Sequence, residues 1–321
     1  MLPMDTPTSQ ARVNQPSLSL ARCLSEIAAG TFTYGQLAAF SNLSRAALRQ
    51  VESAWPSIDQ AMRCRLIAEA VELAEENVQY DFSRLCRFAL TDPEADVRQL
   101  ALSGLWEDES ESLLEEMLEI ARNDDSTDVR AAAVALIGAA LARLRDSESN
   151  SEYLAQIAEL VLNYAVDPSQ PALLRRRAIE AVGSLEQTDH TRSVIHEVFE
   201  HGDQTLEAGA LAAMGRSLES RWRPTVRGAL ASEDPEIRFE SARALGFIGT
   251  SDDVGDLSEL TLDEDSEVRQ AAIFTLGEIG GPGAIRILRN LADQVSESER
   301  DAINEALDTA LLGNDPLRAP I

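Results

Sequence analysis

Lysine is absent from this 321-residue chain, so all of its 28 basic residues are arginine. Against them stand 55 aspartates and glutamates, which gives a formal net charge of −27. Most sequence-independent nucleic-acid binders need a cationic surface that displaces counterions, and this composition excludes them. It also argues against a peripheral protein on anionic membranes. We therefore expect neither a nucleic-acid nor a membrane partner.

Aromatic residues and cysteines are also scarce. Aromatics make up 5% of the chain, while alanine and leucine dominate its apolar residues, a balance that favours helices over a β-sandwich. No apolar run reaches 18 residues, and the first residues lack a charged segment followed by an apolar one, so neither a membrane span nor a signal peptide is expected. The isolated Cys23, Cys64 and Cys86 form no CxxC pair. This usage fits a reducing cytosol and predicts a cytoplasmic location.

One twelve-residue pattern recurs seven times, as in TDVRAAAVALIG from Thr127 and SEVRQAAIFTLG from Ser266. Its register is anchored by Arg98, Arg130, Arg175, Glu207, Arg238, Arg269 and Arg300. Their spacings are 32, 45, 32, 31, 31 and 31 residues, and the loop 143–152 supplies the one insertion. A weaker eighth copy surrounds Arg63. Self-similarity at this period is typical of a stacked repeat architecture.

Each copy has the features of a helical hairpin. Aspartate, serine or proline precedes the motif, as expected at a helix N-terminus. Apolar residues then recur at helical spacing, as at Val268, Ala272 and Leu276, and a glycine follows near the helix end, where it can let a neighbouring backbone pack closely. A shorter helix is expected before each motif helix. One such pair cannot bury its apolar face alone, so the pairs should stack on one another.

The D-x-V-R-x-x-A-x-x-x-L-G pattern resembles HEAT repeats, and more closely the short bacterial variant called phycobilisome-lyase-like HEAT repeats. The resemblance runs from Ser57 to Leu312 and implies an all-α α-solenoid of seven to eight hairpins with an N-terminal helical cap. The expected division is a disordered tail at 1–17, a helical cap at 18–57, the repeat solenoid at 58–312 and a C-terminal tail at 313–321. A docking module at 18–57 is the alternative to a cap.

The arginines at the motif position predict a structural ladder. An acid stands two residues before the arginine in several copies (Asp96, Asp128, Glu236, Glu267), and the resemblance implies that such pairs bridge neighbouring repeats. The ladder residues are Arg98, Arg130, Arg175, Arg238, Arg269 and Arg300.

The resemblance also implies that the second helix of each hairpin lines a concave face. Positions one, two, five and nine after the motif residue then point outward, where apolar groups beside arginine are typical interface anchors. The candidate partner-binding residues there are Arg176, Arg177, Phe239, Arg243, Phe247 and Phe274. The alternative is that Phe239 and Phe274 fill grooves between repeats. Arg221, Trp222 and Arg223 form a further candidate, on an exposed corner or in a solvated helix start.

Charge varies along the chain in a way that bears on the partner. Residues 171–227 are neutral, while 92–128 carry a local charge of −11 and 228–321 carry −13. Such acidic flanks would steer a basic partner, with affinity that falls as salt rises. Acidity that serves only solubility is the alternative.

Catalytic and metal-binding motifs are weak. His196-Glu197-Val198-Phe199-Glu200-His201 matches neither HExxH nor HxxEH, and its i,i+4 pairs lie on different helix faces, so no metal site is predicted. Deoxyhypusine hydroxylase, an enzyme branch of the HEAT family, places His-Glu directly after the motif arginine in several repeats. None of the seven copies here does so; the third has Arg176-Arg177. No catalytic residue or cofactor is predicted.

The sequence thus predicts a non-enzymatic protein-interaction scaffold that binds a protein partner along the concave face of an acidic α-solenoid. One alternative is an accessory to bilin attachment similar to phycobilisome lyases, which rests on the repeat subtype alone. A metal-dependent HEAT-repeat enzyme centred on His196 is the other.

Overall fold

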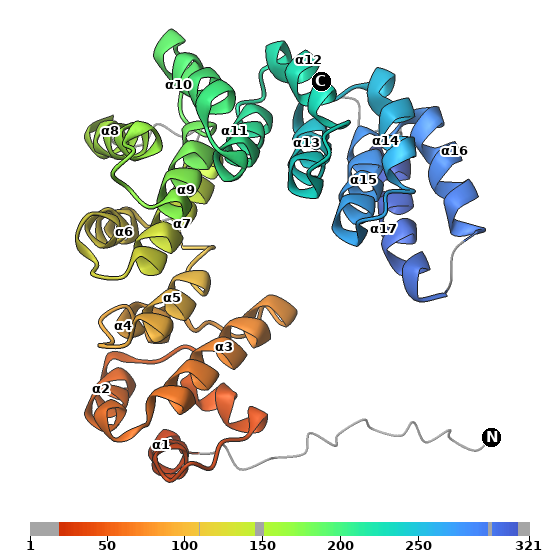
Figure 1. The fold of residues 1–321 in the computed structure, drawn as a ribbon. Coiled ribbons are helices and arrows are strands. Elements are labelled where there is room, and N and C mark those ends of the chain that lie inside the picture. The colour runs from red at the N-terminus through yellow and green to blue at the C-terminus, as the bar shows by residue number, and fades with distance from the viewer. Residues whose placement is uncertain (1–18, 109, 145–150, 295–296, 314–321) are drawn as a thin grey trace, which may run out of the picture. The chain divides into compact units, whose positions relative to one another are not determined.

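The computed structural model describes residues 19–108, 110–144, 151–294 and 297–313, and no strand occurs among them. The chain divides into two compact units, Met1–Glu107 and Asp108–Ile321, which are described separately below (Figure 1). The predicted tail at 1–17, the predicted tail at 313–321 beyond Gly313 and the centre of the 143–152 insertion lie outside the described residues.

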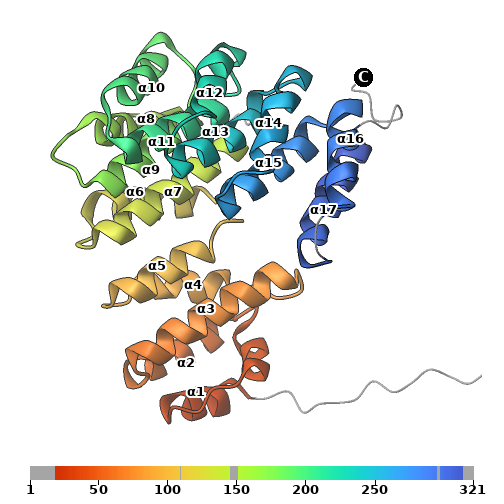
Figure 2. The same ribbon diagram turned by 45° about the vertical axis from the view of Figure 1, so that its right-hand side comes forward.

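Over residues 19–107, the first unit contains five α-helices and two 3-10 turns. In chain order they are α1 (Leu20–Ala28), η1 (Tyr34–Phe40), α2 (Arg45–Ala54), η2 (Trp55–Ser57), α3 (Gln60–Glu76), α4 (Ser83–Ala89) and α5 (Ala95–Ser103). Ser19, Ser44 and Asp59 cap the N-termini of α1, α2 and α3, since each side chain accepts a hydrogen bond from a first-turn amide. Helix α5 packs on both α3 and α4 (Figure 2).

A buried polar cluster ties the predicted cap to the first repeats of this unit. Trp55 Nε1 donates to Asp92 Oδ2 at 2.6 Å, and Arg63 Nη1 pairs with the same oxygen at 3.0 Å. All three side chains are buried. The hydrogen bond from Trp55 therefore ties residues 19–57 to the α4–α5 loop, and the ion pair of Arg63 ties that loop to α3.

The second unit is a run of hairpins in which the motif helix always comes second. Their helices are α6 (Glu111–Asn123), α7 (Thr127–Leu144), α8 (Ser151–Val166), α9 (Ala172–Val182), α10 (Asp189–His201), α11 (Gln204–Arg216), α12 (Arg223–Ala229), α13 (Pro235–Ile248), α14 (Val254–Leu260), α15 (Ser266–Ile279), α16 (Gly281–Ala292) and α17 (Glu297–Gly313). The 3-10 turns η3 (Ser220–Trp222) and η4 (Ser251–Asp253) precede α12 and α14.

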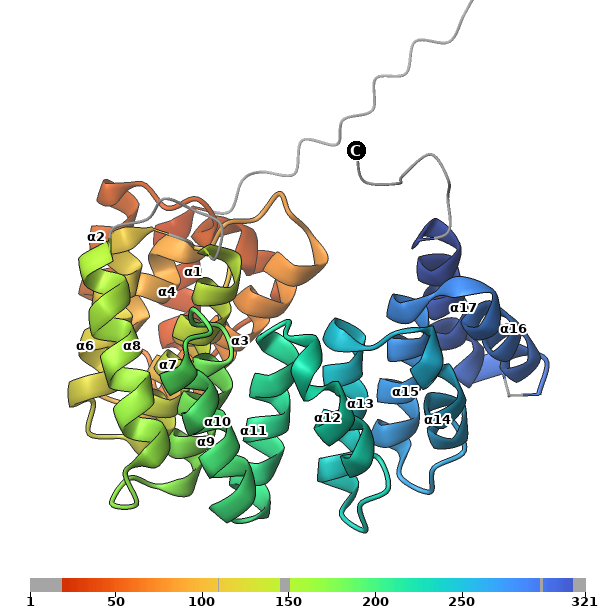
Figure 3. The ribbon, with the colours of Figure 1, turned by 90° about the horizontal axis from the view of Figure 1, so that it is seen from above.

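The motif helices of this unit form a continuous layer, in which α7, α9, α11, α13, α15 and α17 each pack on the next (Figure 3). Helices α8, α10, α12, α14 and α16 lie on the other side of that layer, and the motif helices take the inner side of the curve that the unit describes (Figure 1). The all-α stack of helical hairpins predicted from the repeat is confirmed.

Small residues set the spacing of the layer. In six of the seven motifs the residue in the middle is an alanine or serine that is fully buried, as at Ala178, Ala210 and Ser241. The glycine near the helix end faces the backbone of the next motif helix: a Cβ on Gly183 would lie 2.6 Å from Ala213 Cα, and one on Gly215 would lie 2.7 Å from Ala244 Cα. These glycines therefore allow a backbone approach that any side chain would prevent.

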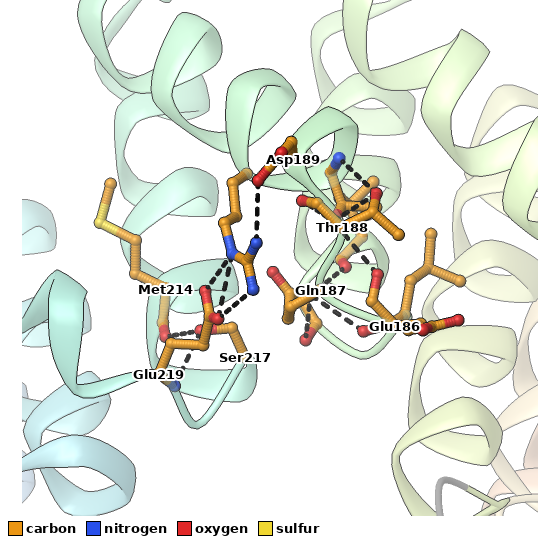
Figure 4. A network of polar contacts seen from close by, with 12 residues as sticks. Glu186, Gln187, Thr188, Asp189, Met214, Ser217 and Glu219 are labelled. Atoms are coloured by element: carbon orange, nitrogen blue, oxygen red, sulfur yellow. Dashed lines mark hydrogen bonds and ion pairs between the residues drawn. The ribbon is translucent and has the colours of Figure 1, made fainter.

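Polar side chains brace the hairpin ends, as Figure 4 shows for the turns that follow α9 and α11. Arg192 of α10 donates through Nε and Nη2 to the carboxylate of Glu219, at 2.6 to 3.0 Å, and pairs with Asp189 at 3.1 Å. Leu218 adopts a positive φ of 60° just before Glu219. Gln187 Nε2 donates to the carbonyl of Leu185 at 2.9 Å, which closes the other turn.

No helix in the described part of the chain is both long enough and apolar enough to span a membrane.

Candidate functional site

The motif arginines bind the loop that leads into their own helix. Nη1 of Arg98, Arg238 and Arg269 each donates to two carbonyls, those of the residues six and five positions earlier. For Arg269 these are the carbonyls of Asp263 and Glu264, at 2.8 and 3.0 Å. The charged donor thus satisfies two carbonyls of the loop that joins the two helices of the hairpin.

The bridges between hairpins run to a residue that the sequence analysis did not single out. Arg238 donates through Nε and Nη2 to both carboxylate oxygens of Asp263, at 2.7 and 2.8 Å. Asp263 stands six residues before Arg269, as Asp92 stands six before Arg98, and Asp92 is the residue that Arg63 reaches. The predicted partner, the acid two residues before the arginine, is occupied elsewhere: Glu236 pairs with Arg176.

The other predicted ladder residues make contacts that differ from one repeat to the next. Arg130 donates to the carbonyl of Ala121 at 3.0 Å and to Tyr164 and Gln170 of the following hairpin. Arg175 donates to the carbonyl of Ala165 at 3.3 Å. Arg300, on α17, is exposed. Glu207 takes the motif position in α11, where burial raises its pKa, with the charge of Asp234 as the lesser cause.

The motif helices α9, α11 and α13 carry a dense charged cluster, which we call the inner cluster because these helices take the inner side of the unit's curve. It contains Arg176, Arg177, Glu180, Arg216, Glu236, Glu240 and Arg243. Arg176 of α9 pairs with Glu180 on its own helix, and it also crosses α11 to pair with Glu236 and Glu240 of α13. Four arginines and three glutamates leave this cluster with one positive charge.

The two central glutamates of the inner cluster, Glu180 and Glu240, are buried, and each lies close to more than one arginine. Glu180 receives Arg177 at 2.9 Å and Arg216 at 3.6 Å, and Glu240 lies 3.7 Å from Arg243. Burial raises the pKa of Glu240, while the nearby arginines act in the opposite direction. Burial lowers the pKa of Arg216, against the attraction of Glu180 and Glu240. The cluster therefore holds charge where water is largely excluded.

Three predicted partner-binding residues form a stripe along one side of α13. Phe239, Arg243 and Phe247 follow each other at i, i+4 and i+8, and the Arg243 guanidinium lies 5.5 Å from the centre of the Phe239 ring. Phe247 is 56% exposed, whereas Phe239 is half-buried.

Phe274 of α15 adjoins this stripe. Thr275 Oγ1 donates to the carbonyl of Ala242 at 2.9 Å, and a Cβ on Gly246 would lie 3.5 Å from the same hydroxyl. Phe274 precedes Thr275 on α15, and Phe247 follows Gly246 on α13. The two phenylalanines therefore stand on adjacent motif helices. Phe274 is 62% exposed, so it does not fill a groove between repeats.

Arg221, Trp222 and Arg223 do not together form the exposed corner that the sequence suggests. Trp222 is buried, and Arg223 Nε donates to the buried Asp253 at 2.7 Å in the next hairpin. Only Arg221 stays exposed. Arg223 also lines a groove of about 770 Å³ between α12 and α14, whose charged walls are themselves ion-paired. The tryptophan belongs to packing between hairpins, because η3 turns its ring inward.

The histidines of α10 lie apart from the inner cluster. His196 is exposed, and His201 Nδ1 lies 3.2 Å from the carbonyl of Glu197. Within the described ranges, no group of three or more His, Cys, Asp or Glu side chains is arranged to hold a metal ion.

Comparison with known proteins identifies the repeat. Residues 191–273 and 254–308 match the family model for HEAT repeats. The chain carries HEAT repeats. Together these segments cover the hairpins from α10 to α17, which include Phe239, Arg243, Phe247 and Phe274.

One curated relative and several solved structures are similar to the chain. Mouse deoxyhypusine hydroxylase is 29% identical over 116 residues, which are 36% of this chain and 38% of the enzyme's length. The complex of CpcE and CpcF of phycocyanin lyase from Nostoc matches 71% of this chain and 94% of the solved one, at 14% identity and a TM-score of 0.45. The Kap95:Nup1 complex matches 95% and 47%, at 12% identity and a TM-score of 0.45.

Proposed function

We propose that this chain is a non-enzymatic, cytoplasmic scaffold that binds a segment of a partner protein on the inner side of α13 and α15. The observation that carries the proposal is the exposed pair Phe247 and Phe274, which stand beside Arg243 on adjacent helices. Large exposed aromatics next to arginine are typical of interface anchors. We name this surface, Phe239, Arg243, Phe247 and Phe274, the aromatic stripe.

The stripe lies on a rigid support. Ala242, Ala244 and Leu245 of α13 are buried against neighbouring helices, and so are Ala272 and Leu276 of α15. A partner segment would therefore lose its own freedom on binding but would order little of the scaffold. HEAT hairpins supply this kind of extended, preformed surface.

The absence of an enzymatic role is part of the proposal. The motif residues of the seven copies, six arginines and Glu207, are followed by pairs such as Arg176-Arg177 and Phe239-Glu240 and never by His-Glu. This chain therefore lacks the pairs that the resemblance associates with the hydroxylase branch.

Affinity capture tests the proposal. The tagged chain and its Phe247→Ser/Phe274→Ser variant are incubated with an extract of the native host, and bound proteins are identified by mass spectrometry. A Val78→Ser/Leu262→Ser variant is the matched control, because it removes two aliphatic residues that are 95% and 77% exposed. We expect a partner that the wild type and the control retain and that the stripe variant loses.

The captured partner is then purified and its dissociation constant is measured with the wild type and both variants. Equal affinity of the stripe variant and the wild type would move the binding surface away from α13 and α15. A salt titration of the same pair tests electrostatic steering by the acidic flanks: affinity should fall between low salt and about 0.5 M.

A further inference from the structure

The inner cluster is a positive island on a strongly acidic protein. Its glutamates Glu180 and Glu240 are 4% and 8% exposed at their side chains, while Arg177 and Arg243 are 38% and 48% exposed. Glu236 is also exposed, at 45%, so Arg177 and Arg243 together outnumber the one carboxylate on the side that solvent and any ligand meet. The charge presented here is opposite in sign to the net charge of −27.

These guanidinium groups keep donors for a ligand. Arg177 donates to the two oxygens of Glu180 through one nitrogen, Nη1, at 3.0 and 2.9 Å. Arg243 lies 3.7 Å from Glu240, beyond hydrogen-bond distance, and its other contact is the face of Phe239. Each guanidinium carries five N–H donors in a planar fork that matches a carboxylate. Arg216 stands between the two helices and adds its charge.

The aromatic stripe begins inside this island. Arg243 belongs to both surfaces, with Phe239 one turn before it and Phe247 one turn after it along α13. A ligand group held by Arg243 would therefore be followed, within about one helical turn, by a surface that favours apolar side chains.

We propose that Arg243 receives the carboxylate of an aspartate or glutamate in the partner, and that apolar residues next to it pack on Phe247 and Phe274. The one uncompensated positive charge of the cluster matches a single carboxylate better than a phosphate dianion. The ligand is thus a short acidic and apolar peptide segment. This inference rests on the proposed function, because it assigns the chemistry of the segment that the stripe binds.

The surroundings strengthen such a contact. Burial raises the pKa of Glu240 and lowers that of Arg216, so the charged groups beneath Arg243 are partly shielded from water, while Arg243 itself is 48% exposed. An incoming carboxylate would replace water at the exposed side of Arg243, and in a site of reduced dielectric the attraction is stronger than on open surface.

A phage-displayed library of random 12-residue peptides is the probe. It is panned on the wild-type chain and, in parallel, on the Phe247→Ser/Phe274→Ser variant. We expect the wild type to enrich peptides with aspartate or glutamate within four residues of a leucine, phenylalanine or similar residue. Enriched peptides without an acid, or with arginine and lysine instead, would overturn the carboxylate assignment and leave the scaffold proposal standing. No enrichment over the stripe variant would overturn both.

Synthetic peptides then locate the contact. Changing the acidic residue of the best peptide to its amide should weaken binding to the wild type at least tenfold, and the same change should matter less than twofold for an Arg243→Gln variant. Additive losses in this double-mutant cycle would place the carboxylate elsewhere. A phosphoserine at the same position should bind no tighter than glutamate, and tenfold tighter binding would reassign the site to phosphate.

Matched variants control for charge and folding. Arg122→Gln/Arg286→Gln removes two exposed arginines of α6 and α16 and should leave peptide affinity within twofold of wild type. Circular dichroism checks helicity of Arg243→Gln. If that variant loses helicity, the acid-to-amide change in the peptide, measured with the unaltered chain, decides the question.

Discussion

The side chain of Arg176 passes directly over Gly209. A Cβ on that glycine would lie 3.1 Å from Arg176 Cγ and 2.8 Å from Ile179 Cγ2. Helix α11 offers no side chain at this point, so the guanidinium of α9 reaches Glu236 and Glu240 of α13. Repeat stacks generally couple only adjacent units, and here one residue joins two hairpins separated by a third.

Replacement of Gly209 by alanine should therefore lower the free energy of unfolding. The new methyl overpacks against Ile179 and costs about 1–3 kcal/mol, which outweighs the gain of about 1 kcal/mol in helix propensity. Gly228 of α12 is the matched control, because a Cβ there meets nothing within 4 Å. Gly228→Ala should stabilise the chain by up to about 1 kcal/mol. Urea unfolding followed by circular dichroism measures both, and equal effects would contradict the crossing.

Asp263→Asn should destabilise the second unit by about 1.5–3 kcal/mol, because both of its oxygens accept charged hydrogen bonds from Arg238. Asp256→Asn is the control: Asp256 pairs with Arg227 at the surface and should contribute at most about 1 kcal/mol.

The effect of Asp263→Asn should depend on pH. Hydrogen bonds from Arg238 are the main cause that lowers the pKa of Asp263 below its ordinary value. A lowered pKa in the folded state gives stability that is present above about pH 4 and is lost as the pH falls through the folded value. Thermal melts at pH 7 should separate wild type from variant, and the difference should shrink as the pH is lowered below about 4. A gap that persisted in acid would mean that the variant disturbs packing instead.

Asp92→Asn should weaken the first unit by about 3–5 kcal/mol, because it leaves Arg63 buried without its counterion and weakens the bond from Trp55. Asp59→Asn is a suitable control, since asparagine caps a helix as well as aspartate does. The fluorescence of Trp55 during urea unfolding reports the change. Equal stability of the two variants would mean that the contact between cap and repeat adds nothing.

The three cysteines should react in a fixed order. Burial raises the pKa of Cys86 to about 12, and Cys23 is also fully buried with a raised pKa, for which burial is the main cause. Cys64 is partly exposed. Iodoacetamide at pH 8 should therefore modify Cys64 first, as followed by mass spectrometry of peptides. Modification of Cys86 at the same rate would show that the first unit opens easily.

Much of this architecture could be predicted from the chain, because periodic signals carry it. The spacing of Arg238, Arg269 and their equivalents predicts the hairpins, and the exposure of Phe247 and Phe274 follows from their offset within the repeat. The ladder partner was missed, although Asp92 and Asp263 share one offset from the motif arginine. Comparing offsets outside the motif would have found it.

Other features depend on contacts that no local pattern encodes. Trp222 lies in η3, a short 3-10 turn without helical periodicity, so no local pattern in the sequence indicates its burial. Arg176 reaches α13 only because Gly209, more than thirty residues later, leaves the path open. The inner cluster is thus a property of three helices together, and each helix considered alone predicts only a solvated charged face.

Asp263 gives its carboxylate to Arg238 and its carbonyl to Arg269. The loop before α15 therefore binds the motif arginine of its own hairpin and also the motif arginine of the hairpin before it. A shortened form of this protein should therefore end after such a loop. A truncated chain that ends near α14 and retains 263–265 keeps the counterion of its last motif arginine.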